Sequence, residues 1–131
     1  MSQETTRQLA IMFTDLVGYS SMMSADEHDA INQLQDYRAL LCPVIESHGG
    51  TVIEFAGDSV FARFPTAAGA VDAGIEIQQA LGRYNHQHNR ELRTRIGVHY
   101  GAVLEKDNQI FGDDINIAAR LEPLGLSLIH I

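Results

Sequence analysis

Residues 51–64, TVIEFAGDSVFARF, decide the fold of this 131-residue chain. The stretch contains two apolar runs that predict strands, residues 51–55 and residues 59–64. Only Ala56, Gly57 and Asp58 separate the two runs. The strands are therefore expected to form a tight hairpin.

Apolar runs on either side of the hairpin predict two more strands. Residues 9–13 form a short run typical of a buried strand, and this strand is expected to end at Asp15. Residues 95–99 predict a fourth strand, which is expected to pair with residues 102–104 across Gly101.

Two helices are expected between these strands. The segment Ser24-Ala25-Asp26-Glu27 has the pattern of a capping box, so a helix should start there. Pro43 is expected to kink this helix or to start a second segment, and His48-Gly49-Gly50 is expected to end it. Pro65-Thr66 opens the second helix, which fades in the polar stretch 84–91.

The order strand, helix, strand, strand, helix, strand predicts an α/β (α+β) fold: a ferredoxin-like βαββαβ core with an antiparallel sheet and helices on one face. In this topology the third strand lies between the first two and is antiparallel to both. The end of the first strand then lies beside the hairpin. Asp15 and Asp58 are 43 positions apart in sequence, yet they are expected to be neighbours in space.

Composition excludes several function classes. The chain is 45% hydrophobic and 20% charged, which indicates one globular domain. A formal net charge of −8 argues against a nucleic-acid partner, and it means that a nucleoside triphosphate would need metal to be accepted. The only cysteine is Cys42, so no intrachain disulfide can form. No apolar run reaches the length of a membrane segment and no signal peptide is evident, so we expect a cytoplasmic protein.

Two aspartates and one helical pair carry the candidate chemistry. Taken singly, Asp15 and Asp58 are most simply turn residues. Brought together, two like charges indicate a cation site, and their hard oxygens suit Mg²⁺ or Mn²⁺. Asn116 and Arg120 lie on one face of an expected helix over residues 115–121, where an amide and a guanidinium suit an anion. An ordinary surface helix face is the alternative for that pair.

Four segments, taken together, carry a resemblance to a known family: residues 13–20 (FTDLVGYS), 57–58 (GD), 95–101 (RIGVHYG) and 111–122 (FGDDINIAARLE). In this order they resemble the two metal motifs, the central strand and the most specific signature of the class III nucleotidyl cyclases, the adenylate and guanylate cyclase catalytic domain.

The resemblance divides the chain into three parts. Residues 8–124 form a partial catalytic domain, and residues 1–7 an N-terminal tail. The apolar residues 125–131 match nothing in the family, which continues instead with a glycine-rich turn, a strand and a phosphate-contacting lysine. We therefore expect a C-terminally truncated chain that is weakly active or inactive.

The resemblance also implies a role for each motif residue. Asp15 and Asp58, helped by the backbone carbonyl of Leu16, bind two Mg²⁺ or Mn²⁺ ions. Asn116 orients the ribose, and Arg120 stabilises charge on the α-phosphate. The β- and γ-phosphates accept hydrogen bonds from the backbone of Val17, Gly18, Tyr19 and Ser20. In this family the site lies between two subunits, so a homodimer with composite active sites is implied, the aspartates coming from one chain and Asn116 with Arg120 from its partner.

Glu54 and Gln109 stand at the two positions that read the base in the family. Glu54 is the residue type that guanylate cyclases use, and an ionised carboxylate accepts the hydrogen bonds that guanine N1–H and N2–H offer. The alternative is that Glu54 simply lies on the solvent face of its strand. Bacterial-looking members of the family favour ATP, so ATP and GTP stay open as near equals.

The sequence therefore predicts a nucleotidyl cyclase, a lyase that converts a purine nucleoside triphosphate, ATP or GTP, to the 3′,5′-cyclic nucleotide and pyrophosphate for intracellular signalling. Two-metal catalysis is the expected mechanism. The alternative function is a catalytically inactive relative, kept as a dimerisation or nucleotide-sensing module.

Overall fold

A computed structural model describes the backbone of residues 4–106, 109–110 and 128–130, and the side-chain environment of residues 7–102. The elements in chain order are β1 (Glu4–Leu16), α1 (Tyr19–Ala25), α2 (Glu27–Ser47), β2 (Thr51–Ala56), β3 (Ser59–Phe64), α3 (Ala67–His88), β4 (Thr94–Lys106), β5 (Gln109–Ile110) and β6 (Leu128–His130).

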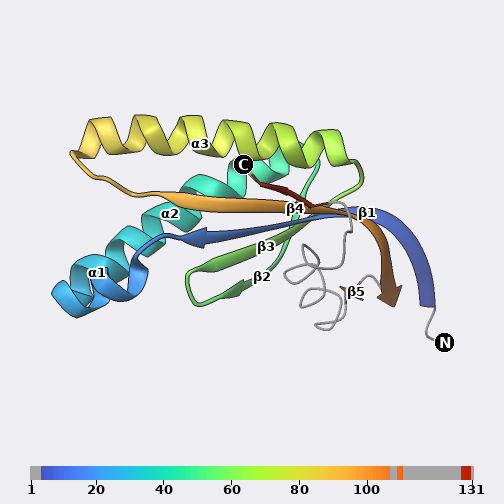
Figure 1. Ribbon diagram of the computed structural model, residues 1–131, viewed down its shortest axis with the longest axis horizontal. Helices are drawn as coiled ribbons and strands as arrows, with labels where there is room; N and C mark the ends of the chain where they lie inside the picture. Colours follow the sequence, from blue (N-terminus) through green and yellow to red (C-terminus); the bar gives the residue numbers. More distant parts are fainter. Residues whose placement is uncertain (1–3, 107–108, 111–127, 131) are drawn as a thin grey trace.

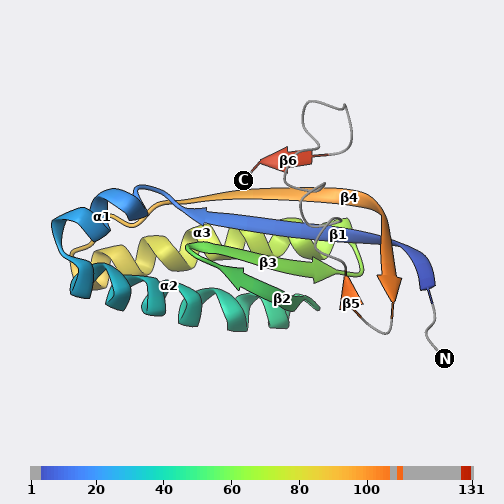
Figure 2. The same ribbon diagram turned by 90° about the horizontal axis from the view of Figure 1, so that it is seen from below.

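The sheet confirms the predicted ferredoxin-like topology. Its strands are ordered β2-β3-β1-β4-β5, with β6 also paired to β4. β3 lies between β2 and β1 and is antiparallel to both. The two long helices, α2 and α3, cover one face of this sheet (Figures 1 and 2). The hairpin between β2 and β3 consequently ends beside the C-terminal end of β1.

The start of α2 differs from the prediction by two residues. Asp26, not Ser24, is the N-cap, and its side chain accepts a 3.1 Å hydrogen bond from the amide of Asp29. Residues 19–25 form the separate helix α1, which the sequence analysis did not predict. The sequence pattern therefore located the start of α2 to within two residues, but the side chain that caps the helix is Asp26.

Pro43 neither divides α2 nor ends it, because the helix continues to Ser47. Proline removes one backbone donor, which leaves the carbonyl four residues earlier, that of Ala39, without its usual partner. Both Pro43 and Ala39 are exposed. Water can therefore solvate the orphaned carbonyl, and the helix tolerates the residue.

The fourth strand also differs from the prediction. We expected a turn at Gly101, but β4 is one continuous strand that pairs with β1 from Leu16↔Thr94 to Glu4↔Lys106. Residues 102–104 therefore pair with β1 and not with residues 95–99. The reason lies in β1, which starts at Glu4, within the segment assigned to an N-terminal tail, and offers β4 a partner along its full length.

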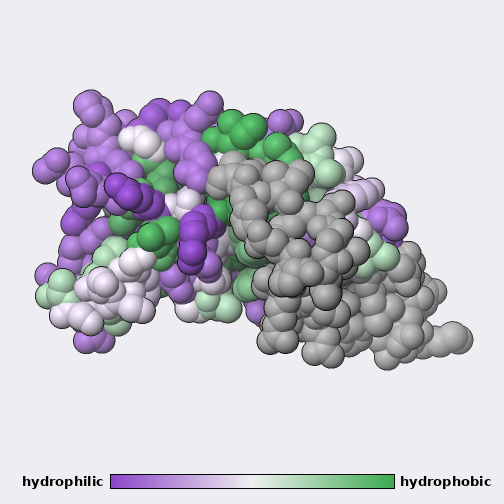
Figure 3. Space-filling view, in the orientation of Figure 1, coloured by the Kyte–Doolittle hydropathy of each residue, from purple (hydrophilic) through white to green (hydrophobic). Residues whose placement is uncertain are grey.

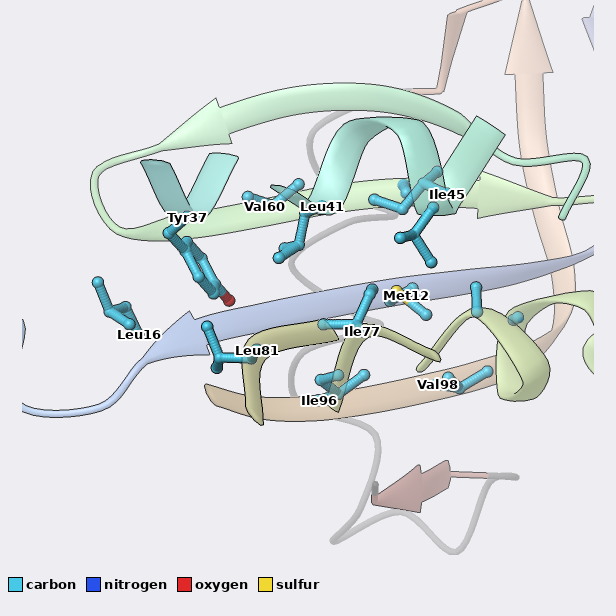
Figure 4. Packing of buried hydrophobic residues seen from close by; sticks show 14 of the residues in the cluster. Met12, Leu16, Tyr37, Leu41, Ile45, Val60, Ile77, Leu81, Ile96 and Val98 are labelled. Atoms are coloured by element: carbon cyan, nitrogen blue, oxygen red, sulfur yellow. The ribbon is translucent and has the colours of Figure 1, made fainter. Parts of the chain in front are cut away.

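The core lies between the sheet and the two long helices (Figure 4). Alternate residues of β1, Ala10, Met12 and Leu16, face the helices, as a period of two requires. They pack against apolar side chains of α2 and α3 that include Leu41, Ile45, Ile77 and Leu81. Residues of opposite parity on β1, among them Asp15, belong to the other face of the sheet.

Hydrophilic side chains cover the C-terminal end of α3 in Figure 3, at the end of the molecule where α1 also lies. The polar stretch 84–91 lies at this end, and the helix ends within it as predicted: Asn89 is the C-cap, in a left-handed conformation. Among the described residues, no helix is both long enough and apolar enough to cross a membrane.

Candidate active site

One open cavity of about 420 Å³ gathers the predicted metal and phosphate residues. It lies where β1 ends, between the β2–β3 hairpin and the start of α1. Its lining includes all seven of those residues: Asp15, Leu16, Val17, Gly18, Tyr19, Ser20 and Asp58. The topology thus brings together two motifs that are far apart in the sequence.

Asp15 is held on three sides at the end of β1. The hydroxyl of Ser59 donates a 2.6 Å hydrogen bond to Oδ1 of Asp15. Nη2 of Arg95 lies 3.7 Å from Oδ2. The backbone carbonyl of Asp15 accepts a 3.1 Å hydrogen bond from Oγ1 of Thr94. These contacts come from β3 and β4, the two strands that flank β1, so the sheet fixes the carboxylate from both neighbours.

Asp58 is the second residue of the two-residue turn between β2 and β3. The first, Gly57, has φ +59, a conformation that glycine adopts at no steric cost and that two-residue hairpin turns require. The backbone carbonyl of Asp58 faces the amide of Leu16 at 3.4 Å. The hairpin tip therefore contacts the chain directly after Asp15, and both aspartates line the same cavity.

The segment after β1 has the features of an anion site. Gly18, at φ +76, is the N-cap of α1. An α-helix leaves its first amides without intrahelical acceptors. In α1 the helical hydrogen bonds begin with the amide of Met22, which donates to the carbonyl of Gly18 at 3.0 Å. The amide of Val17 donates to the carbonyl of Arg93 at 2.8 Å. Amides for a phosphate would therefore come from Gly18 onwards.

A buried tyrosine supports the cavity from below. The hydroxyl of Tyr37 lies 2.9 Å from Oγ1 of Thr14 and also contacts Oγ1 of Thr94. Figure 4 shows the ring reaching from α2 to the end of β1. Burial raises the pKa of Tyr37, and the negative charges of Asp15 and Asp58 raise it further. The hydroxyl therefore stays protonated, and both carboxylates lie close enough to influence it.

The donor set fits Mg²⁺ or Mn²⁺. The two carboxylates of Asp15 and Asp58 and the residue Leu16 line one cavity, and Mg²⁺ characteristically takes one or two carboxylates together with waters and substrate phosphates. Among the described residues, no group of three or more histidine, cysteine, aspartate or glutamate side chains could hold a metal ion. A bound ion would thus depend on oxygens from water or substrate.

The other predicted site residues lie elsewhere. Glu54 is exposed on β2 and pairs with Phe61 of β3, which in turn pairs with Phe13 of β1. This row is on the same sheet face as Asp15: Glu54 lies two strand spacings, about 10 Å, from Phe13, and Asp15 is two residues further along β1. A β-bulge between Val52 and Glu54 sets this orientation.

The backbone of Gln109 belongs to β5, where it pairs with Lys106 of β4. Asn116 and Arg120 lie outside the described residues, so their predicted roles stay predictions.

Three residues of the site escaped the sequence analysis. Arg95 and Ser21 line the cavity, and Tyr37 supports it. Arg95 belongs to a quoted motif, but only its pairing with Asp15 across β1 and β4 reveals where it lies. Tyr37 stands in the apolar stripe of α2, where its hydroxyl gave no sequence signal.

Comparison with known proteins is consistent across sequence and structure. The family model described as "Adenylate and Guanylate cyclase catalytic domain" matches residues 1–131. An adenylate cyclase of Anabaena cylindrica is 32% identical over 139 residues, covering 92% of this chain and 28% of that protein. The chain spans 20–28% of the length of the first curated relatives that it matches.

Two solved structures are similar over 93% of this chain. A protein described as an adenylate/guanylate cyclase/hydrolase from Silicibacter pomeroyi has a TM-score of 0.77 and 37% identity, with 73% of that chain covered. A bacterial light-regulated adenylyl cyclase has a TM-score of 0.78 and 27% identity, with 41% of that chain covered.

Proposed function

The chain belongs to the family of adenylate and guanylate cyclase catalytic domains, and we propose that it converts a purine nucleoside triphosphate to the 3′,5′-cyclic nucleotide and pyrophosphate. The observation that carries this proposal is the cavity at the end of β1, where Asp15 and Asp58 meet the start of α1. Two acids beside helix amides suit a magnesium triphosphate, which an acidic chain could not bind through phosphate contacts alone.

The two aspartates, Leu16 and the segment from Gly18 to Ser20 each have a task in this proposal. Asp15 and Asp58 hold two Mg²⁺ or Mn²⁺ ions with the carbonyl of Leu16. Bound there, the ions lower the pKa of the ribose 3′-hydroxyl and neutralise charge on the triphosphate. The amides from Gly18 to Ser20 donate hydrogen bonds to the β- and γ-phosphates. The segment after β1 therefore orients the phosphate chain relative to the two carboxylates.

The reaction forms one bond and breaks one bond at the α-phosphorus. The 3′-oxygen attacks the α-phosphorus, the bond from that phosphorus to the bridging oxygen breaks, and pyrophosphate leaves while the hydroxyl proton passes to solvent. Arg120 stabilises the charge that develops on the α-phosphate, and Asn116 orients the ribose. We propose that both come from the partner subunit of a homodimer, so that each active site is completed by dimerisation.

The position of Glu54 supports a role in reading the base. It lies on the same sheet face as Asp15, roughly 10 Å across the strands and two residues short of it along β1, a separation suited to the two ends of a nucleotide. Its ionised carboxylate accepts hydrogen bonds, so it favours guanine, whose N1–H and N2–H donate them, over adenine, whose N1 is itself an acceptor. The substrate in this proposal is ATP or GTP. Since such triphosphates are made inside the cell, we propose a cytoplasmic reaction.

The direct test is pyrophosphate release from each of the four nucleoside triphosphates with Mn²⁺, with chromatographic identification of the product. We expect a cyclic purine nucleotide from the wild-type chain and none from Asp58→Asn. Asp72→Asn, an exposed carboxylate of α3, is the matched control and should behave like the wild type. Tight nucleotide binding without any turnover would instead support the inactive nucleotide-sensing module.

A further inference from the structure

Two adjacent residues of α2, Tyr37 and Arg38, contact the two segments that carry the candidate carboxylates. Successive residues of a helix point about 100° apart. Tyr37 therefore reaches the end of β1, while Arg38 reaches the tip of the β2–β3 hairpin. Neither residue lines the cavity. Any effect of these two residues on the carboxylates therefore passes through the backbone that presents Asp15 and Asp58.

Arg38 holds the hairpin at the residue before Asp58. Its Nη2 donates a hydrogen bond to the carbonyl of Gly57. Its guanidinium carbon lies 4.8 Å from the centroid of the Phe55 ring, within the range of a cation–π contact. Phe55 is 46% exposed, so Arg38 covers one side of a ring that has little other cover. The β2–β3 hairpin, which carries Asp58, thus contacts Arg38 of α2 both at the carbonyl of Gly57 and at the ring of Phe55.

The geometry of Arg38 carries a cost that packing alone does not explain. Its Nε is buried and has no hydrogen-bond partner among the residues that the structure describes. An unsatisfied buried donor is unfavourable. The arrangement that leaves Nε unpaired is the one that directs Nη2 at Gly57 and lays the guanidinium on Phe55. A residue placed for stability alone would be expected to satisfy its donors.

Tyr37 holds the other carboxylate. Its hydroxyl bridges Oγ1 of Thr14, the residue before Asp15, and Oγ1 of Thr94 on β4. Thr94 in turn donates to the backbone carbonyl of Asp15. Tyr37 is 1% exposed and Thr14 is equally buried, so the contact between these two side chains is shielded from water. The end of β1 is therefore joined to α2, as the hairpin is.

We propose that Tyr37 and Arg38 form a positioning clamp that sets the separation of Asp15 and Asp58, so that the placement of α2 governs how well the pair holds divalent cations. This inference rests on the proposed function of the two aspartates. Groups that orient metal ligands from behind typically change metal affinity 10–100-fold when they are removed. Neither Tyr37 nor Arg38 is itself a metal ligand in this proposal.

Arg38→Met separates this proposal from simple electrostatics. Methionine keeps an unbranched apolar stem over Phe55 but loses the hydrogen bond to Gly57. Removing a positive charge near two carboxylates should by itself tighten cation binding. Loss of the clamp should weaken it. The direction of the change therefore identifies which effect dominates, and Tyr37→Phe tests the other half of the clamp with no change of charge.

The measurement is Mn²⁺ binding to the full 131-residue chain without nucleotide, followed by electron paramagnetic resonance up to millimolar Mn²⁺. We expect Arg38→Met and Tyr37→Phe each to raise the dissociation constant about 10-fold, and Arg38→Lys, which can still reach Gly57, to recover part of the loss. Thermal denaturation of the metal-free variants establishes that each is folded.

Two control variants separate positioning from general stability. Ser47→Ala removes a 2.9 Å hydrogen bond from the hydroxyl of Ser47 to the carbonyl of Val44 in the last turn of α2, ten residues after Tyr37, and Arg83→Met removes an exposed arginine of α3. Both should leave the Mn²⁺ dissociation constant within twofold of the wild type, even where the melting temperature falls.

The outcomes distinguish the clamp from the proposed function. Unchanged or tighter Mn²⁺ binding in folded Arg38→Met and Tyr37→Phe would overturn the clamp, whatever the activity of the wild-type chain. Wild-type Mn²⁺ binding that both variants weaken, in a chain without cyclase activity, would support the clamp and overturn the proposed function. A wild-type chain that binds no Mn²⁺ would overturn both.

Discussion

Ser59 donates a 2.6 Å hydrogen bond from its hydroxyl to Oδ1 of Asp15, although the two residues are 44 positions apart. Ser59 directly follows Asp58, so this bond joins the hairpin that carries one carboxylate to the other carboxylate itself. The two acids of the site are thus linked through a side chain as well as through the sheet.

Replacing Ser59 should weaken this link. In Ser59→Ala, Asp15 loses a charge-assisted hydrogen bond in a half-buried setting, so we expect a loss of about 1 kcal/mol in the free energy of unfolding and roughly 10-fold weaker Mn²⁺ binding. Urea denaturation and a Mn²⁺ titration measure the two effects. Ser24→Ala, on the exposed surface of α1, is the control. Unaltered Mn²⁺ affinity in Ser59→Ala would show that Asp15 keeps its position without this bond.

The composite active site predicts complementation between inactive subunits. Asp58→Ala should inactivate one half of each site, and Arg120→Ala the other half. In a mixed dimer, one of the two sites retains both wild-type halves, so mixing should restore up to about a quarter of wild-type activity if subunits exchange freely and each complete site acts independently. The measurement is cyclic nucleotide formation against the mixing ratio, with dimerisation followed by analytical ultracentrifugation. Dimers that form but stay inactive at every ratio would rule out a shared site.

The base-reading hypothesis predicts a switch of substrate. If Glu54 and Gln109 contact guanine, then Glu54→Lys combined with Gln109→Asp should invert the donor and acceptor pattern and favour adenine. An unpaired buried polar group costs about 1–3 kcal/mol, so the ratio of kcat/KM for ATP to that for GTP should rise about 10-fold or more. The single variants serve as controls for general damage. A constant ratio in the double variant would mean that these residues do not touch the base.

Alanine substitutions at two glycines are expected to change the free energy of unfolding in opposite directions. A Cβ on Gly97 of β4 would lie 2.3 Å from the ring of Phe13 on β1, so Gly97→Ala forces the ring or the strand to move and should cost about 1–3 kcal/mol. A Cβ on Gly82 of α3 meets no atom within 4 Å, and alanine is the better helix former, so Gly82→Ala should stabilise by about 0.5–1 kcal/mol. Urea denaturation of both variants checks the contrast, and a neutral Gly97→Ala would refute the predicted close contact.

Asp29 should make stability depend on acid pH. Two hydrogen bonds from Arg90, of 3.1 and 2.9 Å, together with one from Gln33, lower the pKa of Asp29 despite an opposing effect of burial. A carboxylate with a depressed folded-state pKa stabilises the protein above its unfolded pKa, near 4. That contribution is lost as the pH falls through the folded-state value.

Asp29→Asn should therefore lower the melting temperature at pH 7, and the difference from the wild type should shrink as the pH falls towards 3. Thermal unfolding between pH 7 and pH 3 measures this difference. Asp72→Asn, on the exposed surface of α3, is the control. A difference that stays constant over the whole range would exclude the ion pair as its source.

The sequence by itself determined the topology and most of the site. Apolar runs separated only by Ala56, Gly57 and Asp58 predict the hairpin, and the order of elements predicts that Asp15 lies beside Asp58. Local signals suffice here because so short a connection forces the two strands to pair with each other in an antiparallel hairpin. The motif from Asp15 to Ser20 likewise maps onto one continuous wall of the cavity, since neighbours in sequence remain neighbours in space.

Tertiary structure alone decided the rest. Residues 102–104 continue β4 because β1 extends to Glu4 and offers them a partner, and no local pattern around Gly101 reveals the length of a strand elsewhere in the chain. The contacts of Arg95 with Asp15, and of Tyr37 and Arg38 with the segments beside the two carboxylates, join residues from different elements. Such contacts depend on sheet register and on how α2 packs, which are properties of the whole fold.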